Sequence, residues 1–236
     1  MILRMSKFIL YLDTLSQPCR AVNLFLLANN VPFETKIVNL AKGKHLSKEF
    51  SEINPFQKVP VLEHNGFVLT ESVAILRYLC REINVADHWY PKDSINQAKV
   101  DEYMEWQHAN TRYNCAMYFQ EKYLKPLLLG KPSNEKLVKI YFNGMEKTCD
   151  TLVTVWLKNK SFLCGNEISV ADLLGACELE QPRMAGYDPR DGRPVLKDWM
   201  ERVRSMLQPH YDTVHERLNK VCSKYGGKPL VVESKL

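Results

Sequence analysis

A chain of 236 residues, with 45% hydrophobic and 25% charged residues, is long enough for one or two folded domains and has an ordinary globular composition. Its 32 basic and 27 acidic residues are interspersed and leave a formal net charge of +5, which, without a nucleic-acid-binding motif, argues against nucleic acid as a partner. The apolar run from Phe8 to Leu12 is too short to cross a bilayer and ends at Asp13 without a cleavage site. We therefore expect a cytoplasmic protein that does not bind membranes.

The cysteines indicate a reducing compartment. The seven cysteines are scattered and include no C-x-x-C pair, which argues against a disulfide framework and against a structural zinc site. The six histidines form no metal-ligand pattern. We expect no metal centre, and we expect most cysteines to be small buried hydrophobic residues.

The first third of the chain alternates strand and helix patterns. Phe8 to Asp13 is apolar and strand-like, and a helical pattern with an apolar face runs from Pro18 to Asn29. Proline suits the first turn of a helix, where its missing N–H is not needed. Phe33 to Leu40 predicts a second strand, and Leu46 to Ile53 predicts one short helix.

A hairpin and another helix follow. Two short apolar runs, Val59 to Leu62 and Phe67 to Thr70, flank Asn65-Gly66, and this arrangement is typical of a β-hairpin. Ser72 is a good helix N-cap, because apolar residues at helical spacing follow it as far as Leu79. The first domain is therefore predicted as βαβ, a connecting segment, and then ββα.

Beyond about residue 84 the sequence contains no convincing strand. Residues 85–93 are predicted as a linker, and we expect one domain over residues 1–86 and an all-helical domain over residues 93–236. Ser169 and Asp172 predict a capping box before an apolar helix. A Gly-Gly pair and a proline predict a loosely held extension from Gly226 onward. The helices are expected at Ile95–Tyr123, Asn134–Leu157, Val170–Glu180, Val195–Leu207 and Tyr211–Lys224.

A βαβ–ββα unit with a proline before its third strand predicts an α/β domain of the thioredoxin fold. In that fold the proline, here Pro60, forms a cis peptide bond and exposes the backbone of the preceding residue, here Val59, to a peptide-like ligand. Ser16 stands in the first strand-to-helix turn, where thioredoxins place a reactive cysteine. A serine cannot carry out dithiol exchange, but its hydroxyl can donate a hydrogen bond to the sulfur of a ligand. Together with the positive end of the helix, this favours a bound thiolate over a thiol.

The energies are adequate for this chemistry. A free thiol has a pKa near ~8.5, and lowering it by roughly two units requires a preference of ~2.7 kcal/mol for the anion. One hydrogen bond to a charged acceptor contributes about 1.5–3 kcal/mol. A helix N-terminus adds a few tenths to ~1 kcal/mol.

Several segments together resemble the theta class of the cytosolic glutathione transferases. The most specific segments are SQPCR, KVP, TESVAI and SVAD, and the likeness runs from about Phe8 to about Leu218. The resemblance implies a homodimer that uses glutathione as co-substrate and holds no permanent cofactor. It implies conjugation of glutathione to small hydrophobic electrophiles, such as halides, epoxides and activated alkenes, with glutathione peroxidase activity in addition.

The resemblance also implies roles for residues near the first strand-to-helix turn and the following loop. Ser16 would hold the glutathione thiolate, and Gln17 would order the same turn. His45 would contact the glycine end of glutathione, and Lys58 would support that carboxylate.

Further roles are implied around the hairpin and in the second domain. The backbone of Val59, before a cis Pro60, would pair with the cysteinyl backbone of glutathione. Glu71 and Ser72 would hold the γ-glutamyl group. Arg112 would lie near the electrophile and hold a leaving group or an anionic substrate, although a plain surface position stays open for it.

Two other functions stay open. Domains of this fold also act as carriers of apolar ligands and as assembly modules, but the intact set of Ser16, Val59-Pro60 and Glu71-Ser72 argues against a purely structural role. A glutathione-dependent thiol oxidoreductase that uses Cys19 is the other alternative. The absence of a partner thiol at the right spacing argues against it.

Overall fold

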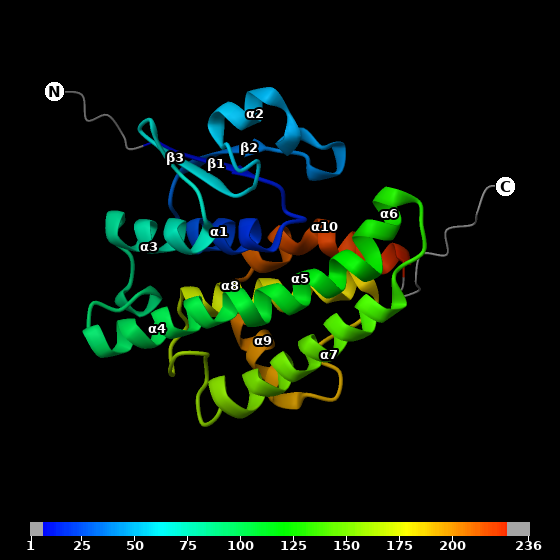
Figure 1. Cartoon of the computed structure of the whole chain (residues 1–236). Coiled ribbons are helices and arrows are strands. Elements are labelled where there is room, and N and C mark those ends of the chain that lie inside the picture. Colours follow the sequence, from blue (N-terminus) through cyan, green and yellow to red (C-terminus); the bar gives the residue numbers. More distant parts are fainter. Residues whose placement is uncertain (1–6, 226–236) are drawn as a thin grey trace.

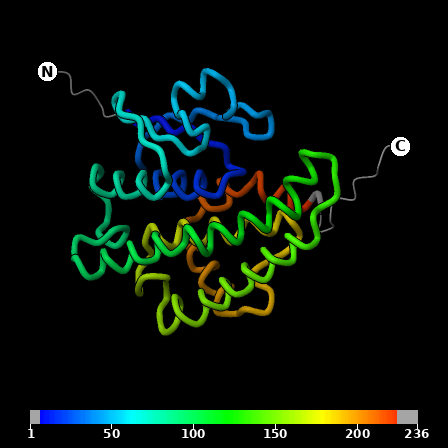
Figure 2. The backbone as a smooth tube through the Cα atoms, viewed as in Figure 1, coloured from blue at the N-terminus to red at the C-terminus, as the bar shows by residue number. Residues whose placement is uncertain are grey.

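The computed structural model describes residues 7–225 and contains a small α/β domain beside a larger helical domain (Figure 1). The chain passes from the first domain to the second through residues 83–93, which include a short 3₁₀ turn at Asp87–Trp89 (Figure 2). The extension expected from Gly226 onward lies outside the described residues.

The first domain has the predicted βαβ–ββα order, so the thioredoxin-like fold class is confirmed. The second strand ends at Ile37 and not at Leu40, because the Asn39 side chain accepts a hydrogen bond from the Lys42 N–H and begins a 3₁₀ turn there. A second such turn occupies Lys44–Leu46. The elements are β1 (Phe8–Leu12), α1 (Gln17–Ala28), β2 (Phe33–Ile37), α2 (Lys48–Ile53), β3 (Val61–His64), β4 (Phe67–Leu69) and α3 (Ser72–Glu82).

The four strands form one mixed sheet in the order β2-β1-β3-β4. Strand β1 runs parallel to β2 and antiparallel to β3, so that Leu10 lies opposite both Thr35 and Leu62. All five residues of β1 are buried, because helices cover both faces of the sheet. Figure 1 shows α1 and α3 on one side of the sheet and α2 on the other.

All named secondary-structure elements in the described part of the second domain are helices, as predicted, and the one β-contact there is an isolated bridge between Phe162 and Gly165. The expected single helix from residue 95 to 123 follows one helical path, but π-helical turns at His108–Arg112 and Gln120–Leu124 interrupt it. A π-helical turn holds an extra residue and is frequent at functional sites. The helices are α4 (Ser94–Gln107), α5 (Tyr113–Phe119), α6 (Lys125–Leu129), α7 (Glu135–Thr151), α8 (Val170–Glu180), α9 (Pro194–Met206) and α10 (His210–Tyr225).

The predicted capping box at the start of α8 is confirmed. The buried Asp172 carboxylate accepts hydrogen bonds from the backbone N–H groups of Ser169 and Leu163, each at 2.9 Å. It also accepts one from the indole N–H of Trp199 at 2.9 Å. One side chain therefore fixes the first turn of α8, the loop before it and the packing of α9.

The two domains meet along α1, which packs against both α8 and α10. Figure 1 shows α1 between the sheet and the helical domain. Most of α1 is buried as a result, including the guanidinium-bearing Arg20, whose side chain has no exposed surface. Burying a charged side chain in an interface requires nearby polar partners.

Candidate functional site

A small cavity of about 110 Å³ opens where the first domain faces the π-helical turn of the second. Six of the nine residues singled out from the sequence line it, namely Lys58, Val59, Pro60, Glu71, Ser72 and Arg112. The remaining lining residues are Pro18, Asn54, Thr70 and His108. Segments far apart in the sequence therefore meet at one site.

The loop before β3 forms one wall of the cavity. The Val59–Pro60 peptide bond is cis, as predicted, and both residues are buried. The Asn54 side chain shapes this loop by donating a hydrogen bond to the Lys58 carbonyl at 2.7 Å and accepting one from the Phe56 N–H at 3.0 Å. Sequence reasoning missed Asn54, although it lies in the INPFQKVP segment and immediately precedes a proline.

The start of α3 forms a second wall. Glu71 precedes the helix with φ of 64° and ψ of 115°, a conformation that L-residues with side chains rarely adopt. Such strained residues cluster at ligand-binding and active sites. The next residue, Ser72, is buried at the first position of α3. The unpaired N–H groups of that first turn make the site favourable for an anion.

Ser16 and Gln17 lie at the start of α1 and are not among the residues that line this cavity, although Pro18 is. Ser16 is the N-cap residue and is half-buried, but its hydroxyl makes no capping hydrogen bond. Its backbone N–H donates to the Asp13 carbonyl at 2.9 Å. The simple interpretation of Ser16 as a capping side chain therefore does not describe this turn.

Asp13 holds the loop that precedes Ser16, and sequence reasoning assigned it no such role. Its carboxylate is fully buried and accepts hydrogen bonds from the Leu15 N–H at 2.9 Å and the Leu40 N–H at 3.0 Å. The residue type gave a signal, since aspartate accepts local backbone hydrogen bonds in turns. The bond to Leu40, far along the chain, had no such signal.

His45 lies in the 3₁₀ turn at Lys44–Leu46, and it does not line the cavity. It is half-buried, and its Nδ1 atom is buried without a hydrogen-bond partner among the described residues. Buried polar atoms in proteins normally have a partner. The Nδ1 atom of His45 is therefore an unsatisfied polar atom in this turn.

Arg112 reaches the cavity from the second domain. Its Nη1 atom lies 2.6 Å from Oε1 of Glu178 on α8, whose side chain is only 2% exposed. The Glu178 carboxylate raises the pKa of Arg112 above its usual range, so the guanidinium stays charged. Sequence reasoning missed Glu178, because this partner lies 66 residues away in the chain.

Both halves of the chain match a family model. The "Glutathione S-transferase, N-terminal domain" model matches residues 9–81, and the "Glutathione S-transferase, C-terminal domain" model matches residues 117–206. "Glutathione S-transferase theta-1" of Bos taurus is 41% identical over 228 residues, which cover 96% of this chain and 95% of that protein. The chain belongs to the theta class of the glutathione S-transferase family.

Solved structures of theta-class transferases resemble this one closely. The apo form of human glutathione-S-transferase T1-1 is 43% identical with a TM-score of 0.88, and the match covers 92% of this chain and 91% of that chain. Human glutathione transferase theta-2, in complex with glutathione and an unknown ligand, is 36% identical with a TM-score of 0.88. That match covers 94% of this chain and 91% of that chain.

The cysteine beside Ser16 in this theta-class chain does not suit redox chemistry. Cys19 is fully buried, and burial raises the pKa of its thiol to about 12, with the Ser16 side chain as an opposing hydrogen-bond partner. A thiol with such a pKa is not a nucleophile near neutral pH. The oxidoreductase alternative is therefore not favoured.

Among residues 7–225, no helix combines the length and the apolar character that crossing a membrane requires. Within the same residues, no group of three or more His, Cys, Asp or Glu side chains could hold a metal ion.

Proposed function

We propose that this theta-class transferase conjugates reduced glutathione to small hydrophobic halides, epoxides and activated alkenes, and that it also reduces organic hydroperoxides with glutathione. The observation that supports this most is the cavity at the cis peptide bond, where Lys58, Val59, Glu71 and Ser72 come together. The theta-2 relative that was solved with glutathione supports the same ligand here.

The cavity suits one end of the tripeptide. Its volume of about 110 Å³ is well below the roughly 300 Å³ at which ordinary ligand pockets begin. The Glu71 carboxylate complements an ammonium group, while the Ser72 hydroxyl and the first turn of α3 complement a carboxylate. An α-amino acid carries both groups, so we assign this cavity to the γ-glutamyl end of glutathione.

Ser16 supplies the chemical step in this proposal. Its hydroxyl is not used in capping α1, so it can donate a hydrogen bond to the glutathione thiolate, and Gln17 stabilises the same turn. The thiolate sulfur then forms a bond to the electrophilic carbon. With a halide, the carbon–halogen bond breaks and the halide leaves with its electron pair. With an epoxide, the ring C–O bond breaks and the oxygen takes a proton from water.

The other predicted residues suit the two remaining parts of the reaction. The half-buried imidazole of His45 and the exposed side chain of Lys58 suit the glycine carboxylate. The Val59 backbone suits the cysteinyl part. Arg112, held by Glu178, faces the cavity from the second domain and suits a leaving group or anionic substrate.

We extend the proposal to assembly and domain boundaries. The chain forms a homodimer in which the first domain of one subunit, residues 1–86, packs against the second domain of the other, residues 93–236. Size-exclusion chromatography with light scattering distinguishes a 27.4 kDa monomer from a particle of twice that mass. A mass that stays at the monomer value across concentrations contradicts the dimer.

We also propose a cytoplasmic location, and the sequence suggests how to test it. The sequence contains Ser234-Lys235-Leu236, and where such a tripeptide forms a free C-terminus, an import receptor reads it as a peroxisomal address. Two fluorescent fusions are compared, one with the label before Met1 and one with the label after Leu236. Diffuse signal from both supports the cytoplasm. A punctate peroxisomal signal that appears only with the label before Met1 overturns the proposed cytoplasmic location.

One experiment separates the enzyme from a binding module of the same fold. Purified protein is applied to immobilised glutathione and then assayed against a panel of an aryl halide, an epoxide, an activated alkene and a hydroperoxide. We expect the column to retain the wild-type protein and the panel to show turnover. In Glu71→Gln, we expect the glutathione KM to increase about tenfold, because one charge-assisted hydrogen bond is lost. Glu82→Gln, at the exposed end of the same helix, is the matched control. Retention without turnover across the panel supports the binding module, and the absence of both refutes the proposal.

A further inference from the structure

The loop from Asp13 to Ser16 is fixed by side chains of the second domain. Within the loop itself, the Ser16 N–H donates to the Asp13 carbonyl and the Leu15 N–H donates to the Asp13 carboxylate. These two bonds make a tight turn, but they do not fix its direction relative to the rest of the protein. The Leu40 N–H of the first domain also donates to the Asp13 carboxylate, and the contacts that join the loop to the second domain come from residues more than 150 positions further along the chain.

Arg217 of α10 makes the first of these contacts. Its Nη1 atom donates to the Asp13 carboxylate at 2.6 Å. The Asp13 side chain has no exposed surface, while that of Arg217 is 42% exposed. A buried carboxylate with a cationic partner is strongly held, because loss of that partner would leave a buried charge uncompensated. Arg217 therefore fixes Asp13 together with the Leu40 N–H, and Asp13 fixes the turn.

Gln181, directly after α8, makes the second contact. Its Nε2 atom donates to the Leu15 carbonyl at 3.2 Å, one residue before Ser16. Its Oε1 atom accepts a hydrogen bond from Arg20 at 2.8 Å, so the orientation of the amide is set. Gln181 is buried with 1% exposure. The amide has no room to exchange its partners for water.

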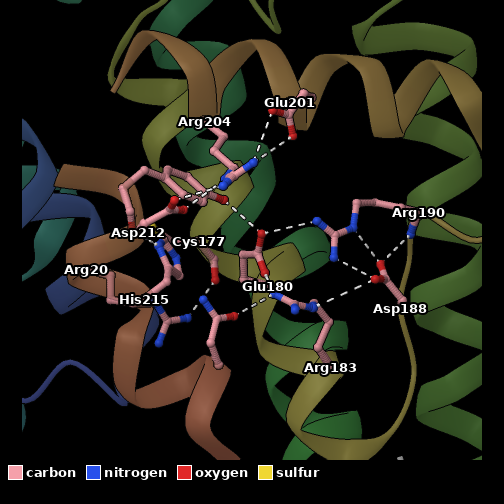
Figure 3. A network of polar contacts seen from close by, with 12 residues as sticks. Arg20, Cys177, Glu180, Arg183, Asp188, Arg190, Glu201, Arg204, Asp212 and His215 are labelled. Carbon is pink, nitrogen blue, oxygen red and sulfur yellow. Dashed lines mark hydrogen bonds and ion pairs between the residues drawn. The ribbon is translucent and has the colours of Figure 1, made fainter. Parts of the chain in front are cut away.

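Arg20 links the loop, α1 and α8 from the inside. Its buried guanidinium donates to the Thr14 carbonyl at 2.9 Å and to the Cys177 carbonyl of α8 at 2.9 Å. Figure 3 shows Arg20 extending from the first domain toward Cys177. Among residues 7–225, no ion pair includes Arg20, and the acceptors of its hydrogen bonds are the neutral oxygens of Thr14, Cys177 and Gln181.

The helices that carry these contacts are themselves anchored. Tyr211 at the start of α10 donates a hydrogen bond to the buried Glu180 at 3.0 Å, and Glu180 also pairs with Arg183 and Arg190 (Figure 3). Helix α10 is thereby attached to the end of α8. Arg217 and Gln181 consequently act from one rigid part of the second domain.

From these contacts we infer that Gln181 and Arg217 are positioning residues for the Ser16 hydroxyl. The inference rests on the proposed function, because it concerns the same hydroxyl and thiolate. A hydroxyl that stabilises a thiolate must be aimed at it, and a misplacement of ~1 Å can cost up to ~100-fold in rate. The second domain thus contributes to the ionisation of glutathione as well as to the electrophile site.

The test compares two positions on α10. Arg217→Gln removes the contact with Asp13, whereas Lys220→Gln makes the same change of charge at an exposed pair with Glu216, away from the loop. In Arg217→Gln we expect kcat to fall by about tenfold, the pH profile of kcat/KM to shift to higher pH, and the glutathione KM to stay within about twofold. Arg217→Lys restores most of kcat, and Lys220→Gln matches the wild type.

Gln181 and amide hydrogen exchange provide a second, independent test. Gln181→Met removes the donor to Leu15 at similar size and is expected to shift the pH profile in the same direction. If either variant folds poorly, amide hydrogen exchange at Leu15 and Ser16 in the folded fraction must still be faster than in Lys220→Gln. The inference is overturned if Arg217→Gln and Gln181→Met both keep the wild-type pH profile and the wild-type amide exchange rates while Ser16→Ala loses turnover. That result leaves the proposed function intact. Full turnover in Ser16→Ala overturns both.

Discussion

Replacing Ser16 by alanine isolates the contribution of one hydroxyl. In the folded protein this hydroxyl makes no capping hydrogen bond, and the backbone N–H of residue 16 keeps its bond to the Asp13 carbonyl in the variant. Alanine in place of a capping serine usually costs about 0.5–2 kcal/mol, and the lower end applies where no capping bond is lost. We therefore expect a folded variant that still binds glutathione.

The expected effect on the thiol follows from the energy of one hydrogen bond. A bond to a charged acceptor contributes about 1.5–3 kcal/mol, and one pKa unit corresponds to ~1.4 kcal/mol, so the pKa of bound glutathione should rise by about one to two units. If the pKa of bound glutathione is ~6.5 in the wild type, half of it is thiolate at pH ~6.5. In Ser16→Ala, the thiolate fraction at that pH falls to between ~1% and ~10%. The rate at that pH should fall by about five- to fifty-fold.

Two measurements check this prediction. Ultraviolet titration of the enzyme–glutathione complex gives the pKa of the bound thiol directly, and the pH dependence of kcat/KM with one halide gives it independently. Ser16→Thr keeps a hydroxyl and serves as the control. An unchanged titration curve together with wild-type turnover in Ser16→Ala would show that another group holds the thiolate, and the proposed chemistry would be wrong.

Three further predictions concern buried polar groups. Asp172→Asn should lower the free energy of unfolding by about 3 kcal/mol, measured in urea, because the hydrogen bonds of Asp172 to backbone and Trp199 lose their charged acceptor; an unchanged midpoint would contradict this. Glu178→Gln should free Arg112 from its pair and raise the KM for the electrophile more than the KM for glutathione, and equal changes would argue against Arg112 at the electrophile site. Burial lowers the pKa of His215 from 6.5 to about 4, so below pH 6.5 the unfolded chain binds a proton that the folded protein does not. The contribution of His215 to the free energy of unfolding is therefore fully present above pH 6.5, and this free energy should fall by about 3 kcal/mol as the pH drops to 4. A His215→Asn variant whose free energy of unfolding depends on pH with the same slope would refute this.

Local patterns were enough to predict the first domain and its central loop. The run Phe8–Leu12 is apolar because β1 is covered on both faces, and Asn65-Gly66 suits a turn in which both residues have positive φ. The cis bond before Pro60 followed from the fold context. In each case the physical cause lies within a few residues of the sequence signal, so the sequence is sufficient.

The contacts around Ser16 have causes that no local pattern carries. Arg20 has the sequence context of an ordinary helical cation, yet it is fully buried because α8 and α10 cover α1. Its partner Gln181 lies 161 residues away, and Arg217 lies 204 residues from Asp13. The π-helical turn at His108–Arg112 was missed for a related reason, since helical periodicity does not register one extra residue in a turn.

The buried guanidinium of Arg20 has a consequence for how the chain can be divided. Two of its hydrogen-bond acceptors, the Cys177 carbonyl and the Gln181 amide, belong to the helical half. A fragment that stops at residue 86 would keep Arg20 in the middle of α1 but would lose those acceptors together with the helices that cover it. Such a fragment would have to turn this cation toward water, and the apolar face of α1 would become exposed with it. We therefore expect that residues 1–86 alone do not fold into a stable unit.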